Sequence, residues 1–154
     1  MVVGGGRDAR RAGPGALKRG QATVKPGLAP GVEREVTFEV TREMCPAFDG
    51  VVVHQVCATW TLVHFMELAG RRVLIDFLDE GEEGVGSHAS CDHLGPAPVG
   101  SKVRVVATVT DVTDRELGCD VAAYRGERKI ATGRTVQKIF PREVLKRLLG
   151  EGGG

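Results

Sequence analysis

Residues 56–69 constrain the fold of this chain more than any other part of the sequence. Ten of these fourteen residues are apolar, and they occupy every side of a helix drawn through the segment. A helix that is apolar all round belongs in the interior of a fold, so we expect residues 56–69 to form a long, enclosed helix. The segment also carries Glu67, and an unpaired charge is very costly to bury. Glu67 is therefore expected to be buried beside a partner or to have a chemical role.

The segments on either side of this helix are typical of strands. Residues 32–40, before the helix, alternate apolar and polar side chains, which predicts a half-buried strand. At least four further strands follow the helix, and consecutive strands joined by short turns pair antiparallel. A short helix that begins at Pro141 ends the pattern. The later strands and this helix are expected at residues 85–91, 102–109, 118–124, 129–139 and 141–149.

An enclosed apolar helix and a series of antiparallel strands are both accommodated by an α+β fold in which an antiparallel sheet wraps around one long central helix. This arrangement is similar to the hotdog fold, whose sheets usually pair edge to edge as dimers. We predict that the helix ends near Gly70, where Arg71 and Arg72 would lie at the negative end of its dipole. Residues 44–50, which Pro and Gly interrupt, are expected to form a loop.

Length and composition predict a single soluble domain behind a basic N-terminal segment. The 154 residues suffice for one domain with a core. Residues 1–25 hold six basic residues and one acidic residue, whereas the remainder holds 15 basic and 19 acidic residues. We therefore expect a flexible basic extension over residues 1–30 and one domain over residues 31–150. A net charge of +1 favours no nucleic-acid partner, and no stretch reaches the roughly 18 apolar residues of a membrane span.

The cysteines indicate a reducing compartment. Cys45, Cys57, Cys91 and Cys119 are widely separated and contain no CxxC pair, so their spacing matches neither a zinc site nor a disulfide framework. We expect reduced thiols in a cytoplasmic protein that holds no metal.

The polar residues of the central helix define a candidate site. At about 100° per residue, Glu67 lies roughly 80° and His64 roughly 140° from Thr59, so these three share one side, while Thr61 points away. Two other interpretations stay open. His64 could be a structural histidine, and Glu67 could pair with Arg71 one turn later, a surface pair worth only about 0.3–0.5 kcal/mol.

A second cluster of polar residues lies at 84–100. His93 lies at the end of the strand expected there, two residues past Cys91, and the prolines that follow mark the place where the chain leaves the sheet. A strand end is a common place for a working side chain, although a surface histidine is the alternative. Asp92 directly precedes His93.

Together these motifs resemble the fluoroacetyl-CoA thioesterase branch of the hotdog thioesterases. The resemblance rests on Thr-x7-Glu in the helix and on Val-Gly-x6-His-Leu-x-Pro-x-Pro-Val-Gly at residues 85–100. It implies that Thr59, Glu67 and His93 are the catalytic set, that Gly86 lines the acyl pocket and that the N–H of Trp60 stabilises an oxyanion. We expect His64 among the substrate-binding residues as well. Gly50 and Val53 stand where phenylalanines precede the helix in that branch, which implies a general short-acyl enzyme.

The expected function is hydrolysis of a short acyl-CoA thioester, with no cofactor other than the CoA of the substrate. Glu67 would act as general base or nucleophile. Thr59 and Glu67 lie roughly 12 Å apart along one helix, so a shared site requires Glu67 of one chain to approach Thr59 of another in a homodimer or a higher homo-oligomer. The alternatives are a non-catalytic acyl-binding protein and an enoyl-thioester hydratase that uses Asp92 and His93.

Overall fold

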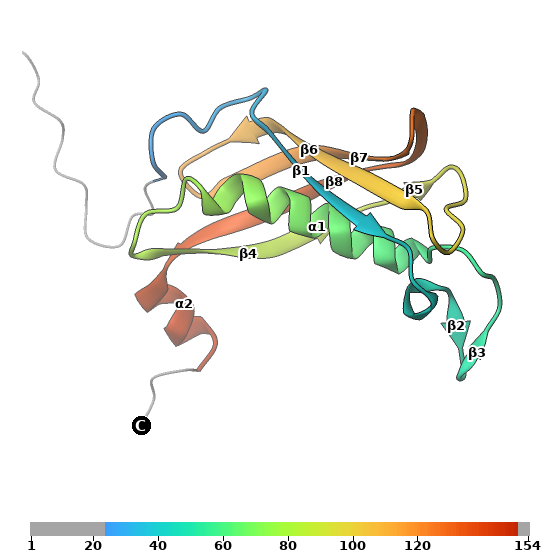
Figure 1. Ribbon diagram of the computed structural model, residues 1–154. Coiled ribbons are helices and arrows are strands. Elements are labelled where there is room, and N and C mark those ends of the chain that lie inside the picture. Colours follow the sequence, from blue (N-terminus) through green and yellow to red (C-terminus); the bar gives the residue numbers. More distant parts are fainter. Residues whose placement is uncertain (1–23, 151–154) are drawn as a thin grey trace, which may run out of the picture.

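A computed structural model describes residues 24–150 as an antiparallel sheet curved around a helix (Figure 1). The strands follow the order β1-β6-β7-β8-β4, and the short strand β5 also pairs with β8. All of these pairs are antiparallel, as the short turns predicted. The strands are β1 (Glu33–Glu39), β4 (Glu82–Ala89), β5 (Asp92–His93), β6 (Lys102–Val112), β7 (Glu116–Arg125) and β8 (Arg128–Pro141).

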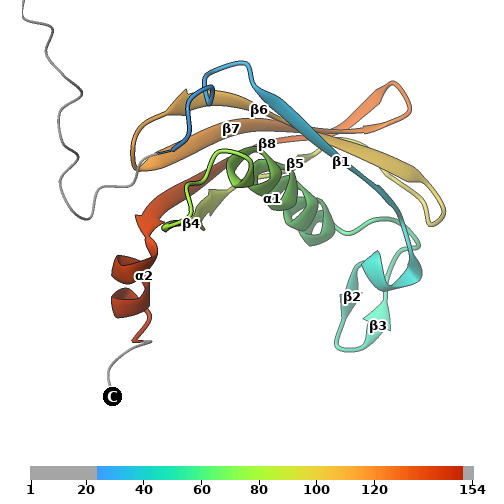
Figure 2. The same cartoon turned by 60° about the vertical axis from the view of Figure 1, so that its left-hand side comes forward.

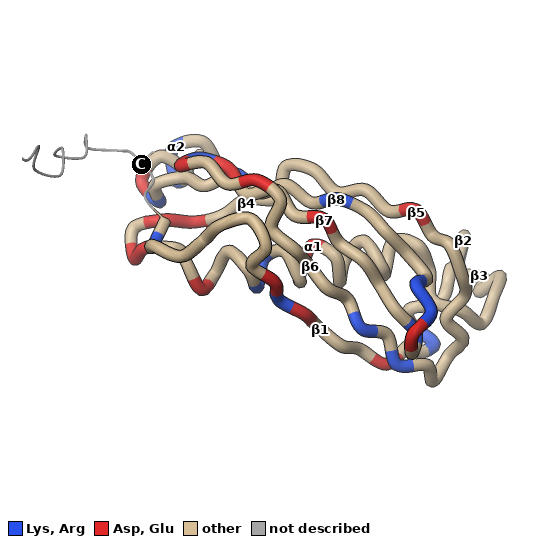
Figure 3. Tube along the Cα trace, turned by 90° about the horizontal axis from the view of Figure 1, so that it is seen from above, with Lys and Arg blue, Asp and Glu red and all other residues tan. Residues whose placement is uncertain are grey.

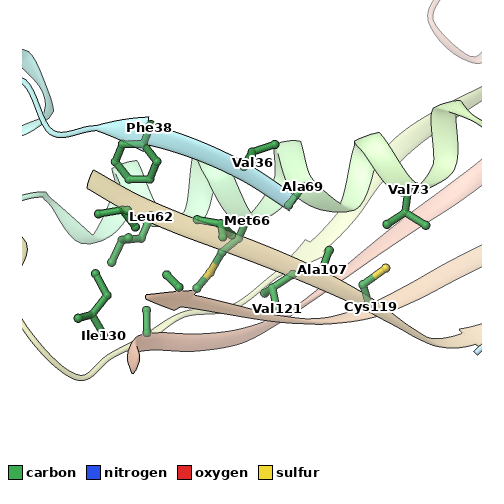
Figure 4. Close-up of a cluster of buried hydrophobic side chains, with 14 of the residues drawn as sticks. Val36, Phe38, Leu62, Met66, Ala69, Val73, Ala107, Cys119, Val121 and Ile130 are labelled. Atoms are coloured by element: carbon green, nitrogen blue, oxygen red, sulfur yellow. The ribbon is translucent and has the colours of Figure 1, made fainter. Parts of the chain in front are cut away.

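The core lies between the concave face of this sheet and helix α1 (Thr59–Ile75), which the strands cross in Figure 2. Side chains of β6 alternate as a strand requires, with every second residue from Val103 to Val109 facing the helix. Leu62 and Met66 of α1 are completely buried against them (Figure 4). Truncation of either side chain to alanine would cost about 2–5 kcal/mol.

Helix α1 begins and ends later than predicted. It starts at Thr59 and passes through Gly70 to Ile75, so the predicted end at Gly70 is wrong. The physical reason is the distance between the helix and the sheet. A Cβ on Gly70 would lie 2.8 Å from Thr135 Oγ1 of β8, which shows that glycine permits close packing here and does not stop the helix.

Among residues 24–150, the fold encloses only one side of α1. Leu62, Met66 and Val73 face the sheet and are buried, while the opposite side is open. His64 and Glu67 are exposed on that open side. The prediction of a fully enclosed helix is therefore wrong for one chain, because the sheet covers a single face of α1.

Smaller elements project beyond the two ends of the sheet, on the same side of the sheet as α1 (Figure 2). The predicted loop at residues 44–50 contains the end of a 3-10 helix, η1 (Arg42–Met44), and the first strand, β2 (Ala47–Phe48), of a hairpin. The second strand of the hairpin, β3 (Val51–Val52), follows the loop. At the other end, α2 (Arg142–Leu148) follows β8 directly. The helix was predicted to begin at Pro141, and it begins one residue later, with Pro141 at the N-cap.

The chain packs against the core from the first described residue onward. Val24 and Leu28 contact core residues, and the N–H of Lys25 donates to the carbonyl of Phe77 at 2.7 Å. Residues 1–23 of the predicted basic extension lie outside the described residues, so the division at residue 30 stays a prediction.

Charged residues of both signs are interspersed over the described part of the chain (Figure 3). On β1, for example, Glu33 and Glu35 flank Arg34, which pairs with Asp76 at 2.9 Å. Within residues 24–150, no helix is long and apolar enough to cross a membrane.

Candidate functional site

Thr59 and His93 meet at the start of helix α1. Thr59 is the first residue of the helix, and His93 is the last residue of β5. The Thr59 hydroxyl and His93 Nδ1 lie 3.0 Å apart, within hydrogen-bond distance. The structure therefore brings together two of the three predicted catalytic residues within one chain.

Free backbone N–H groups lie beside this pair. Ala58, which precedes the helix, has no side chain that could cap it. The N–H of Thr61 donates to the carbonyl of Ala58 at 3.1 Å, but those of Thr59 and Trp60 have no acceptor among the described residues. Unpaired donors at a helix N-terminus, together with the helix dipole, favour negative charge. The start of α1 can thus stabilise an oxyanion.

The other polar residue at this end of the helix has a structural role. The Thr61 side chain is buried, and its hydroxyl donates to the carbonyl of Met44 at 3.2 Å. This bond ties α1 to η1, and it agrees with the prediction that Thr61 points away from Thr59.

The contacts of His93 are consistent with one tautomer of its ring. Nε2 is buried and has no hydrogen-bond partner among the described residues. A neutral imidazole has one N–H and one acceptor nitrogen, and a hydrogen on Nδ1 places this single donor where the Thr59 oxygen can accept it. In this tautomer Nδ1–H donates to Thr59 Oγ1 and leaves the Thr59 hydroxyl hydrogen free to reach a ligand.

Glu67 lies two turns further along α1 and faces away from the core. Its side chain is exposed in the single chain, so the prediction that one chain buries it is wrong. The carboxylate faces Gly86 of β4, where a Cβ would lie 3.9 and 4.0 Å from the two oxygens. Thus Glu67 and Gly86 are neighbours, but among residues 24–150 no hydrogen bond joins Glu67 to Thr59 or His93.

Arg71 is paired with a different carboxylate from the one considered in the sequence. Its guanidinium donates to Glu83 at 2.8 Å and to the carbonyl of Gly84 at 3.1 Å. Burial alone would raise the pKa of the Glu83 carboxyl, but the hydrogen bonds from Arg71 and from the Gly84 N–H outweigh it and lower the pKa. The alternative pairing of Glu67 with Arg71 is therefore absent from the described residues.

Trp60 and His64 line the open side of the helix start. Trp60 is 50% exposed, and Phe48 of β2 packs edge-on against it with ring centroids 5.6 Å apart. A groove of about 380 Å³ runs between η1 and α1, and both Trp60 and His64 line it. Our sequence reasoning missed Phe48, because residues 44–50 were expected to be a loop. An aromatic residue beside Asp49-Gly50 was the available signal for a hairpin.

Asp92 and His93 point to opposite faces of the sheet. His93 reaches Thr59, while Asp92 lines a groove of about 650 Å³ on the outer face together with Tyr124 and Lys129. Successive side chains of a strand alternate in this way. The two residues therefore do not converge on one substrate, which disfavours the hydratase alternative.

The cysteines are free thiols. Burial raises the pKa of Cys57 and that of Cys119 to about 11, which suppresses the nucleophilic thiolate. Among the described residues, no group of three His, Cys, Asp or Glu side chains is arranged to hold a metal ion.

Comparison with known proteins identifies relatives over most of the domain. The profile of the family described as fluoroacetyl-CoA-specific thioesterase (FlK) matches residues 40–143. The fluoroacetyl-CoA thioesterase of Streptantibioticus cattleyicolor is 33% identical over 79 residues, which are 51% of this chain and 57% of that protein. The chain therefore spans little more than half the length of this curated relative.

Solved structures confirm the α+β hotdog fold. A Thermus thermophilus protein described as a thioesterase superfamily member is 38% identical, with a TM-score of 0.77 over 80% of this chain and 92% of that one. The fluoroacetyl-CoA thioesterase FlK is 23% identical, with a TM-score of 0.73 over 83% of this chain and 99% of that chain. The second likeness supports the fold alone. Because the family profile matches more than half of its length, the chain belongs to the family described as fluoroacetyl-CoA-specific thioesterase.

Proposed function

We propose that the protein is a thioesterase that hydrolyses short acyl-CoA thioesters to the free acid and CoA. The observation that carries the proposal is the Thr59–His93 hydrogen bond at 3.0 Å, formed where α1 offers the unpaired N–H groups of Thr59 and Trp60. Thioester hydrolysis needs donors for a developing oxyanion beside groups that position the acyl carbonyl. The start of α1 supplies both.

The residues would divide the reaction as follows. The thioester carbonyl oxygen accepts hydrogen bonds from the helix N-terminus while the Thr59 hydroxyl orients the acyl group. The Glu67 carboxylate takes a proton from an attacking water, or it attacks the carbonyl carbon itself to form a mixed anhydride that water hydrolyses after CoA has left. The carbon–sulfur bond then breaks, and the CoA thiolate leaves with a proton relayed through His93. When hydrolysis is run in ¹⁸O-labelled water, label in the Glu67 side chain would distinguish its attack from base catalysis.

A second copy of the chain would complete the site. Thr59 and Glu67 lie roughly 12 Å apart along α1, too far to act on one carbonyl within a single chain. Exposed apolar side chains lie along the open face of α1, at Trp60 and Ile75. Among the described strands, one edge of β4 has no partner, and such an edge is a template for another strand. A homodimer that joins these edges would bring the Glu67 of one chain toward the Thr59 of its partner.

The acyl group is proposed to be small. Glu67 and Gly86 face each other with no side chain on Gly86 between them, which leaves room for a short acyl group. Fluoroacetyl-CoA belongs among the test substrates, because the Streptantibioticus relative is named for it. Gly50 and Val53 stand where that branch has phenylalanines, so acetyl-, propionyl- and butyryl-CoA are expected to be hydrolysed as well.

A thiol-release assay over this panel tests the function. The wild type should release CoA, and Glu67→Ala should reduce turnover by about 10³-fold or more, as expected for a lost base or nucleophile. Glu80→Ala is a matched control, since Glu80 is an exposed carboxylate in the turn after α1, and it should leave turnover unchanged. Saturable acyl-CoA binding without hydrolysis by the wild type would instead identify a non-catalytic binding protein.

A further inference from the structure

The strands β4 and β5 form one interrupted strand. Ala89 pairs with Thr135 of β8, and Asp92 pairs with Thr132. Ala89 and Asp92 are three positions apart in the sequence, as are their partners Thr135 and Thr132, so the register on β8 is the same before and after the gap. The interruption therefore removes no residue from the ladder and must have a local cause at residues 90 and 91.

The cause is a replaced hydrogen bond at Ser90. The N–H of Ser90 donates to the carbonyl of Arg134 at 2.9 Å, as in a regular antiparallel pair. The return bond is different, because the N–H of Arg134 donates to the Ser90 hydroxyl at 3.0 Å and not to the Ser90 carbonyl. The side chain of Ser90 thus takes the place of its own backbone acceptor.

The displaced carbonyl of Ser90 lies over Gly133. A Cβ on Gly133 would collide with this oxygen, so only glycine leaves space for it. Beyond this point Asp92 and His93 pair with two residues of β8, and the chain then leaves the sheet, where the N–H groups of Leu94 and Gly95 both donate to the carbonyl of Ile130. The turned peptide after Ser90 therefore sets the direction in which the last residues of β5 meet α1.

We infer that Ser90 is a positioning residue, whose hydroxyl stabilises the turned peptide above Gly133 and so holds His93 at Thr59. The expected effect of Ser90 on catalysis rests on the proposed function. The contact between His93 and Thr59, however, can be measured whether or not the protein is a thioesterase. Loss of the Ser90 hydroxyl leaves the Arg134 N–H without its acceptor and favours return of the Ser90 carbonyl to the ladder. This change would rotate β5 and draw the His93 ring away from the Thr59 hydroxyl.

The test compares Ser90→Ala with Ser90→Thr, which keeps a hydroxyl, and with Ser87→Ala. Ser87 is a matched control, because its hydroxyl also bonds β8, at the carbonyl of Val136. Displacement of a catalytic group by about 1 Å can cost about 100-fold in rate. We expect Ser90→Ala to lower kcat by about 10- to 100-fold with KM nearly unchanged, Ser90→Thr to restore most of kcat, and Ser87→Ala to match the wild type.

The second readout is the ¹H–¹⁵N spectrum of the histidine rings. Wild type and Ser90→Thr should show one tautomer for His93, with hydrogen on Nδ1, and Ser90→Ala should show averaged nitrogen shifts. An unchanged His93 signal in folded Ser90→Ala would overturn the inference. If Ser90→Ala does not fold, Ser90→Cys, which has a similar shape and a weaker acceptor, decides the question by the same signal. A wild type without hydrolysis would refute the proposed function, and the His93 signal would still decide the role of Ser90.

Discussion

Substitution of Gly70 by alanine tests how closely α1 packs against the sheet. Gly70 is buried in the middle of α1, and a Cβ there would lie 2.8 Å from Thr135 Oγ1. Real Cβ contacts essentially never come so close, so Thr135 or the helix must move. Thr135 is 3% exposed and β-branched, in the middle of β8, which leaves its side chain little freedom to give way.

Two opposing terms determine the net effect on the free energy of unfolding. Alanine is better than glycine in a helix interior by about 1 kcal/mol. Overpacking in a filled core costs about 1–3 kcal/mol. We therefore expect Gly70→Ala to destabilise the fold by up to about 2 kcal/mol. In a Thr135→Ala background the next neighbour is Gln137 Nε2 at 3.6 Å, an ordinary contact, so the same substitution should stabilise the fold by about 1 kcal/mol.

Urea unfolding of the wild type, both single variants and the double variant measures this coupling. The free energies should differ from additivity by about 1–3 kcal/mol, as expected for residues in contact. The sign of the Gly70→Ala effect should reverse between the two backgrounds. Equal stabilisation by Gly70→Ala in both backgrounds would refute the argument that glycine is required there for close packing.

Three further predictions concern the thiols, an ion pair and the tryptophan. At pH 8, alkylation should modify Cys57 and Cys119 about 100-fold more slowly in the folded protein than in the unfolded chain, because burial raises the pKa of each thiol to about 11 and so depletes the thiolate. Mass spectrometry of alkylated peptides measures both rates, and equal rates would contradict the prediction. Because the pKa of Glu83 is lowered in the fold, its pair with Arg71 should contribute about 0.5 kcal/mol at pH 7. This contribution is present above the ordinary glutamate pKa and is lost as the pH falls through the lowered one. The destabilisation caused by Arg71→Gln at pH 7 should therefore shrink as the pH falls through this range, and a cost that does not change with pH would refute the pairing. Trp60, the single tryptophan, is half exposed in one chain, so dilution that separates a dimer should shift its fluorescence emission to longer wavelength. If the emission does not change over the concentration range in which the dimer dissociates, Trp60 is not at the interface.

The sequence predicted the elements whose pattern is local. The alternation along residues 102–109 predicted a strand that exists and extends to Val112. The apolar run at residues 56–69 likewise predicted a central helix. The end of that helix could not be predicted, because the role of Gly70 depends on Thr135, which lies far away in the sequence.

The site was less accessible to sequence reasoning. Thr59 and His93 are 34 residues apart in the sequence, and only the resemblance to a known family predicted that they belong to one site. Glu67 was expected to be buried because its neighbours are apolar, yet their burial depends on which side of α1 the sheet covers. The role of Ser90 has no sequence signal of its own, since it arises from a backbone turn over Gly133.

The central claim is that one active site takes Thr59 from one chain and Glu67 from another. Thr59→Ala and Glu67→Ala chains carrying different affinity tags can be co-expressed and purified as the mixed dimer. If the residues act across the interface, one of the two sites in this dimer is intact, and it should hydrolyse acyl-CoA at about half the wild-type rate per dimer. A mixed dimer no more active than the two single variants would show that both residues act within one chain and would contradict the account.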